Sequence, residues 1–308
     1  ARHRLELHPA NPSPYKVLLG RLGVERLAAQ GRDWQSFPPL DPNDADALAV
    51  KNSAIKQRQG GPAAKAPAAN AAAAAVAKAV SSDATIAARL LQVVNSPLYR
   101  GANAINNLQS AIARLGPPLV RNLVTSLILK QLFQTKSALL RQRMQVLWEH
   151  STQVAAISHI LARKFTRLQP DEAMLAGLIH DIGALPILQK AENHPELLAD
   201  ETQLNDIIDK LHASIGRLIL ESWKFPPELV TAAAEHENLT RISDQVDYTD
   251  IVTVANLHSY LGSKHRHARV KFTDVPAFTK LGLTPETSIS AMEEAAAEMK
   301  DVKSMLAA

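Results

Sequence analysis

The residues of this sequence that could carry chemistry are histidines and one aspartate, placed far apart along the chain. They are His150, the adjacent pair His180 and Asp181, His212 and His236. Imidazole nitrogen and carboxylate oxygen together suit a borderline divalent metal such as iron, manganese or zinc. We therefore treat these residues as candidate metal ligands.

The apolar pattern predicts a long helix over about residues 139–165 from which His150 points inward. His150 shares one stripe of this helix with Leu147, Val154, Ile157 and Leu161. His159 lies nine residues further on, which is about half a turn round the helix, so we expect His159 to face solvent.

The other candidates also lie on or beside apolar stripes. His212 shares a stripe with Ile208, Ile215 and Ile219, and His236 shares one with Leu229 and Ala233. His180 and Asp181 stand at the end of an apolar helix. For any one histidine, a buried imidazole with a single hydrogen-bond partner is the simpler interpretation. The group as a whole favours a metal site, because helix bundles build such sites from facing helices.

The composition indicates which elements position these side chains. Of the 308 residues, 46% are apolar but only 4% are aromatic, so the core consists of aliphatic residues, and alanine and leucine favour helix. From about residue 71 the apolar spacing is helical, and no apolar–polar alternation typical of strands occurs. We predict an all-α fold. There is no cysteine, which excludes disulfides, thiolate zinc sites and thiol nucleophiles.

The predicted domain organisation has four parts. Residues 1–58 are an unassigned N-terminal segment, for which the remnant of an upstream domain is one interpretation. Residues 59–70, rich in Gly, Pro and Ala, form a flexible linker. Residues 71–265 form the helical domain. Residues 266–308 form a C-terminal extension whose last part, Pro285–Leu306, we predict to be one amphipathic helix that docks on the domain or on a second copy.

The order of the histidines and Asp181 is similar to that of the HD superfamily of metal-dependent phosphohydrolases. The stretch Gly177–Gly183 resembles the equivalent stretch of HD-GYP phosphodiesterases. More specifically, the chain resembles the HDOD (HD-related output domain) family. The segments that carry this second resemblance are Ala84–Tyr99 with its Asn-Ser-Pro element, Leu108–Gly116, Val120–Val124, His212–Gly216 and Trp223–Pro226. The resemblance implies a multi-helix HD-like bundle with an additional N-terminal helical subdomain, and a bacterial signalling role without enzymatic activity.

Several departures from the HD pattern bear on activity. Asn256 stands where the pattern has its last aspartate ligand, and an amide is a weaker ligand than a carboxylate. Ala184 stands where the phosphodiesterases have a lysine that contacts phosphate. We therefore expect a degenerate metal site with His150, His180 and Asp181 as first candidates and His212, His236 and Asn256 as further ones. The predicted function is a non-catalytic signalling output domain. The alternative is a metal-dependent phosphohydrolase or phosphodiesterase acting on a nucleotide.

The charge pattern bears on partners and location. The net charge is +4, and a basic cluster contains Lys264, Arg266, Arg269 and Lys271. We interpret this cluster as a solvated loop, with a docking patch for an anionic partner as the alternative. A nucleic-acid partner is not favoured, because the basic residues do not form a broad face. We expect a signalling protein or small ligand as partner, with a homodimer as a further candidate. No stretch has the length of a membrane span, and we expect a cytoplasmic protein.

Overall fold

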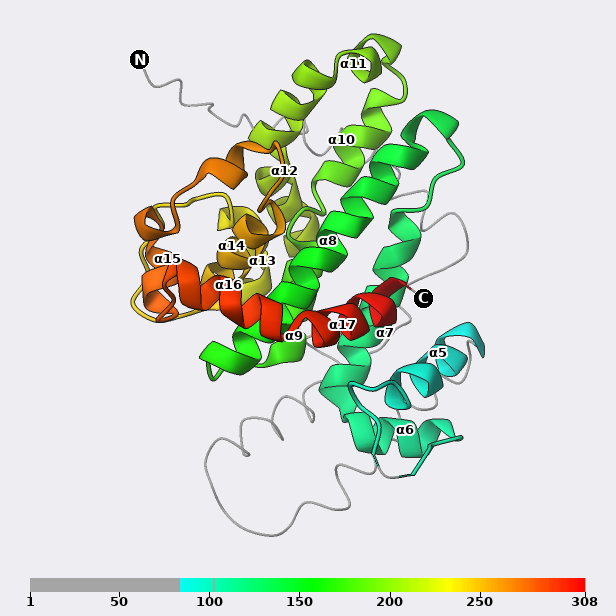
Figure 1. The fold of residues 1–308 in the computed structure, drawn as a ribbon. Coiled ribbons are helices and arrows are strands. Elements are labelled where there is room, and N and C mark those ends of the chain that lie inside the picture. The colour runs from blue at the N-terminus through cyan, green and yellow to red at the C-terminus, as the bar shows by residue number, and fades with distance from the viewer. Residues whose placement is uncertain (1–83, 102, 308) are drawn as a thin grey trace. The chain divides into compact units, whose positions relative to one another are not determined.

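The computed structural model describes residues 84–101 and 103–307. These residues form α-helices and short 3-10 helices joined by turns, with no β-strand among them (Figure 1). They all belong to one compact unit spanning residues 56–308. The all-α prediction is confirmed for this described part. The predicted N-terminal segment (1–58) and linker (59–70) lie outside the described residues.

The first described helices are α5 (Ala84–Val94), α6 (Leu108–Leu115) and α7 (Pro117–Leu132), which pack on one another. Helix α5 ends directly before the Asn-Ser-Pro triplet, as expected because proline disfavours helix in the residue that precedes it. Gly116 separates α6 from α7 with a φ of 81°, a conformation that favours glycine. These helices correspond to the predicted N-terminal helical subdomain.

Helix α8 (Ala138–Phe165) is the centre of the fold. It packs against α9 (Pro170–Ile179), the next helix in the chain, and against α14 (Tyr248–Ser259) and α17 (Ala296–Ala307), which come from distant parts of the sequence (Figure 1). From Val154 to Ala162 every side chain is buried. A helix that is covered on all sides has no solvent face in this region.

The prediction that His159 faces solvent is therefore wrong. The His159 side chain is buried, and its residue is only 4% exposed. Its Nδ1 lies 3.7 Å from Oδ1 of Asp171 on α9, and its Nε2 lies 3.8 Å from Oε1 of Glu298 on α17. His159 does lie on the opposite face of α8 from His150, as nine residues of helix require. Helix α17 covers that face and keeps it from solvent.

A second group of helices follows α9. They are α10 (Ala184–Ala191), α11 (Pro195–Ala199), α12 (Glu201–Ser222) and α13 (Pro227–Glu235). Helix α12 packs against α10 and α13, and α13 packs against α14. Because α9 packs against both α8 and α13, the candidate ligands on these elements can converge on the α9–α10 turn.

Gly177 explains how closely α9 approaches α8. A Cβ atom at this position would lie 2.8 Å from both the Ala155 Cα and the Ser158 Oγ of α8. Real Cβ contacts are longer, so the two helices touch through backbone at this point. The close approach fixes the end of α9, where His180 follows, relative to α8.

The C-terminal part contains η2 (Arg266–Arg269), η3 (Phe272–Asp274), α15 (Pro276–Lys280), α16 (Pro285–Glu294) and α17. The predicted single helix over 285–306 is wrong, because the structure has two helices with a break at Ala295. No proline or glycine marks this break. Helix α17 instead packs against α8 and buries Val302, Met305 and Leu306. Tertiary packing therefore overrides the uniform helix propensity of this segment. Among the described residues, no helix is long and apolar enough to cross a membrane.

Candidate metal centre

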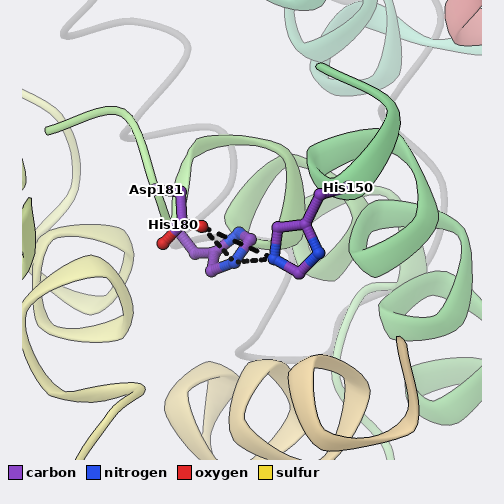
Figure 2. A group of neighbouring side chains, drawn as sticks. All are labelled: His150, His180 and Asp181. Carbon is purple, nitrogen blue, oxygen red and sulfur yellow. Dashed lines mark hydrogen bonds and ion pairs between the residues drawn. The ribbon is translucent and has the colours of Figure 1, made fainter. Parts of the chain in front are cut away.

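The structure brings the predicted metal ligands together around the carboxylate of Asp181. His150 comes from α8 and His212 from α12, while His180 and His236 directly follow α9 and α13. Oδ2 of Asp181 lies 3.4 Å from Nε2 of both His150 and His180 (Figure 2). Oδ1 lies 3.3 Å from Nε2 of both His212 and His236.

These side chains form two groups with metal-binding geometry. The first group is His150, His180 and Asp181, and the second is Asp181, His212 and His236. Within each group, one ligand atom per residue lies within 4.8 Å of the others. Asp181 belongs to both groups and contributes a different oxygen to each. A carboxylate shared between two groups of ligands is common in proteins that bind two metal ions.

The hydrogen bonds of the imidazoles fix their tautomers. The Nδ1 atoms of His180, His212 and His236 each contact a backbone carbonyl oxygen, and a carbonyl can only accept. The three carbonyls belong to Gly177, Ile208 and Ala233, at 2.7, 2.7 and 3.0 Å. Each Nδ1 therefore carries a proton, so each Nε2, which faces Asp181, is the atom available to bind a metal. Metal-bound histidines in proteins are held by the same kind of hydrogen bond.

The resulting arrangement of lone pairs fits a cation. Nε2 of His212 lies 3.2 Å from Nε2 of His236, and the same distance separates the Nε2 atoms of His150 and His180. Two unprotonated nitrogens this close repel each other unless a proton or a cation lies between them. Imidazole nitrogens and a carboxylate suit iron, manganese or zinc. These residues fit a divalent metal.

The pKa shifts of Asp181, His150 and His180 agree with this donor set. Burial alone would raise the pKa of Asp181, but the imidazoles, led by His180, hold it well below its usual value. Burial lowers the pKa of His180 to about 3 and also lowers that of His150. For His236, burial alone would lower the pKa, but the adjacent Asp181 carboxylate raises it, so a metal would compete there with a proton. At neutral pH Asp181 is ionised and His180 is neutral, as metal binding requires.

Asn256 lies beside the cluster on α14 and is buried. Its Nδ2 donates a hydrogen bond to Oε1 of Glu237 at 3.2 Å. Its Oδ1 is buried without a hydrogen-bond partner among the described residues. An unsatisfied buried oxygen is costly, and a bound cation would satisfy it. The position of Asn256 is thus compatible with the weaker ligand role predicted for it.

Glu237 is a residue of this site that the sequence analysis missed. Its Oε1 lies 3.7 Å from Nε2 of His236, and its Oε2 lies 3.0 Å from Nη2 of Arg266 and 3.2 Å from Nε2 of His267. Burial would raise the pKa of this carboxyl, but the hydrogen bond from His267 and the nearby His236 lower it to about 2. The signal in the sequence was its place directly after His236.

The loop after α14 covers the His150 side of the cluster. The ring of Tyr260 stacks on His150 with centroids 4.9 Å apart and on His265 with centroids 3.7 Å apart. The predicted partner-binding residues Lys264, Arg266, Arg269 and Lys271 lie in or beside this loop and are exposed. Arg266 pairs with Asp209 and Glu237, so this part of the basic cluster is tied to the centre. Partner binding by these residues stays a prediction.

Comparison with known proteins identifies the family. The sequence model of the HDOD domain matches residues 64–239, more than half of the chain. The chain belongs to the HDOD family. No curated protein sequence matches this HDOD chain.

Solved structures share the fold of this HDOD protein. One from Shewanella amazonensis SB2B, provisionally named a metal-dependent phosphohydrolase, is 25% identical with a TM-score of 0.62, over 95% of this chain and 98% of that one. An HDOD domain protein of unknown function from Geobacter sulfurreducens is 18% identical with a TM-score of 0.59, over 94% and 99% of the two chains. A protein from Marinobacter aquaeolei VT8, provisionally named a signal transduction protein, is 19% identical with a TM-score of 0.59, over 87% and 60%.

Proposed function

We propose that this HDOD chain is a signal-transduction output domain that holds a divalent metal and does not hydrolyse phosphate. It acts by binding a protein partner or a small ligand. The family membership supports the signalling role, as does the name of the Marinobacter structure that shares its fold. The Asp181-centred cluster supports the metal, because lone pairs of three imidazoles and a carboxylate face one another there.

The observation that carries the non-catalytic part is the identity of residue 184. Ala184 begins α10, three residues after Asp181, and is only 1% exposed. The HD-GYP enzymes that the chain resembles have a lysine there, which contacts phosphate. A methyl group supplies no positive charge for a phosphate, and charge neutralisation is the main requirement of phosphoryl transfer.

Two features around the cluster point the same way. Arg266 pairs with Asp209 and Glu237, so its charge is already neutralised within the protein. Tyr260 stacks directly on His150 and narrows access from that side. Arg266 is therefore not a free cation that could neutralise a phosphate at this site.

A bound metal would supply a positive charge that the ligands share. In the first group, His150 from α8 would hold a metal with His180 and Asp181 from the α9–α10 turn. In the second group, Asp181 would hold one with His212 from α12 and His236 at the end of α13. The residues of this chain would then join four elements at one point. We propose that this link sets the relative positions of α8 and α12, on which a partner surface depends.

The second candidate function is a metal-dependent phosphohydrolase acting on a nucleotide. Its specific support is the double group around Asp181, because two metal ions bridged by one carboxylate are typical of phosphoesterases. The name given to the Shewanella structure points to the same chemistry.

The two functions differ in phosphate hydrolysis by the metal-loaded protein. The full chain is loaded separately with iron(II), manganese and zinc, and hydrolysis of p-nitrophenyl phosphate and bis(p-nitrophenyl) phosphate is followed. A His180→Ala/Asp181→Ala protein serves as the control for contaminating activity. We expect metal binding by the wild type and equal, background hydrolysis by both proteins. Metal-dependent hydrolysis that the double variant lacks would overturn the output-domain proposal.

A further inference from the structure

We propose that Glu237 is an additional metal ligand that completes the group formed by Asp181, His212 and His236. This inference rests on the metal centre of the proposed function. The HD pattern has two adjacent histidines where this chain reads Glu235-His236-Glu237, with a single histidine.

The position of Glu237 is the first support. Its Oε1 lies 3.7 Å from Nε2 of His236, and that same nitrogen lies 3.3 Å from Oδ1 of Asp181. Two carboxylate oxygens therefore flank one imidazole nitrogen. Carboxylate oxygen is a common ligand of zinc, iron and manganese beside imidazole nitrogen.

The orientation of the carboxylate is the second support. Its far oxygen, Oε2, accepts hydrogen bonds from Arg266 and from the buried His267. Arg266 also pairs with Asp209, at 3.2 Å, three residues before His212 on α12. The near oxygen, Oε1, is left facing the cluster with one hydrogen bond from the neutral Asn256 amide. Ligating carboxylates are typically held in this way through hydrogen bonds from outside the metal's own ligands.

The charge of the site is the third support. Asn256 occupies the place of the last aspartate of the HD pattern and is neutral. Glu237 adds a second carboxylate that interacts electrostatically with Asp181 and accepts a hydrogen bond from the Asn256 amide. The Oδ1 of Asn256 is buried without a hydrogen-bond partner among the described residues, so a bound cation would satisfy this oxygen as well. Metal affinity rises with the number of charged ligands, so two carboxylates hold a divalent ion better than one.

The test compares metal binding by four full-length proteins, stripped of metal with a chelator. They are the wild type, Glu237→Gln, Glu237→His and the control Glu235→Gln. Zinc affinity is measured by competition with a chromophoric chelator, and cobalt(II) is added separately for its visible absorption spectrum. Glu235 is the matched control because it is also next to His236 but pairs with Arg241.

We expect Glu237→Gln to weaken one metal equivalent by at least about tenfold and to alter the cobalt spectrum. Glu235→Gln should behave as the wild type. Circular dichroism and thermal unfolding establish that each variant is folded. If Glu237→Gln does not fold, the Glu237→His protein carries the comparison.

The histidine variant separates a ligand from a purely structural residue. An imidazole can bind the metal but cannot replace a carboxylate in accepting the two hydrogen bonds from Arg266 and His267. A ligand role predicts that Glu237→His retains metal better than Glu237→Gln and shifts the cobalt bands. A structural role predicts equal losses in both variants, which would overturn the inference.

The remaining outcomes distinguish this inference from the proposed function. Unchanged affinity and spectrum in Glu237→Gln would overturn the inference alone. A wild type that binds no metal would overturn it together with the metal centre. Phosphate hydrolysis by the metal-loaded wild type would overturn the output-domain proposal and leave the role of Glu237 standing.

Discussion

Gly183 approaches the backbone of His212 so closely that no side chain fits between them. A Cβ atom at Gly183 would lie 1.9 Å from the carbonyl oxygen of His212 and 2.5 Å from the nitrogen of Gly216. Gly183 follows Asp181 by two residues, so this contact sets the distance between the Asp181 carboxylate and α12. The glycine is needed for the close approach and not for an unusual φ, which is −69°.

Replacing Gly183 by alanine should destabilise the protein by roughly 3 kcal/mol, because backbone must move to admit the methyl group. Chemical denaturation monitored by circular dichroism measures this change. Gly216→Ala is the matched control across the same contact. A Cβ at Gly216 would meet its nearest atom at 3.5 Å, and alanine favours helix, so this variant should be neutral or stabilising. Equal stability of Gly183→Ala and the wild type would contradict the close contact.

Asp181 should be the one ligand on which both metal equivalents depend. Asp181→Ala removes a ligand from each group, whereas His150→Ala and His212→Ala each affect one group. We expect Asp181→Ala to lose all bound metal and each histidine variant to keep one equivalent of the pair. Elemental analysis after dialysis measures the ratio. His194→Ala, a change at a more exposed histidine outside the cluster, should retain the wild-type ratio. Retention of both equivalents by Asp181→Ala would exclude a shared carboxylate.

Asn256→Asp should raise metal affinity and lower the stability of the metal-free protein. The new carboxylate would replace an amide that donates to Glu237 at 3.2 Å, so two buried negative charges would face each other. We expect a loss of about 1–3 kcal/mol without metal and roughly tenfold tighter binding with it. Thermal unfolding with and without zinc measures both effects, and the exposed Asn238→Asp is the control. No gain in affinity would count against the place of Asn256 beside the metal.

The stability of the metal-free protein should fall as the pH drops from about 6.5 to about 4. His258 is buried against Phe272 and Phe278, and burial lowers its pKa to about 4. In this interval the unfolded chain binds a proton at His258 and the folded chain does not, so acid favours unfolding. The full effect of this residue is about 3 kcal/mol.

His258→Gln removes this titration while keeping a polar group near Ser288, its hydrogen-bond partner. Urea denaturation in chelator at a series of pH values should show a shallower loss of stability for this variant than for the wild type. His194→Gln, at a more exposed position, should leave the wild-type slope unchanged. Parallel slopes for His258→Gln and the wild type would show that folding does not lower the pKa of His258.

Much of the fold could be predicted because local spacing determines it. The apolar pattern over about residues 139–165 predicted α8, observed at Ala138–Phe165, and the same stripe oriented His150 inward. The candidate ligands His150, His180, Asp181, His212 and His236 could be chosen for their type and for the faces they occupy. The structure brings all of them to one point.

Only the tertiary structure decided the relations between elements that periodicity does not connect. Local sequence could not show that α17 covers His159, or that the C-terminal helix breaks at Ala295 so that α17 packs against α8. It also could not place Glu237 beside the cluster, because Arg266 and His267, which hold its far oxygen, come from a loop after α14. Helical period sets which face a residue occupies, whereas its neighbours depend on which distant segment packs against that face.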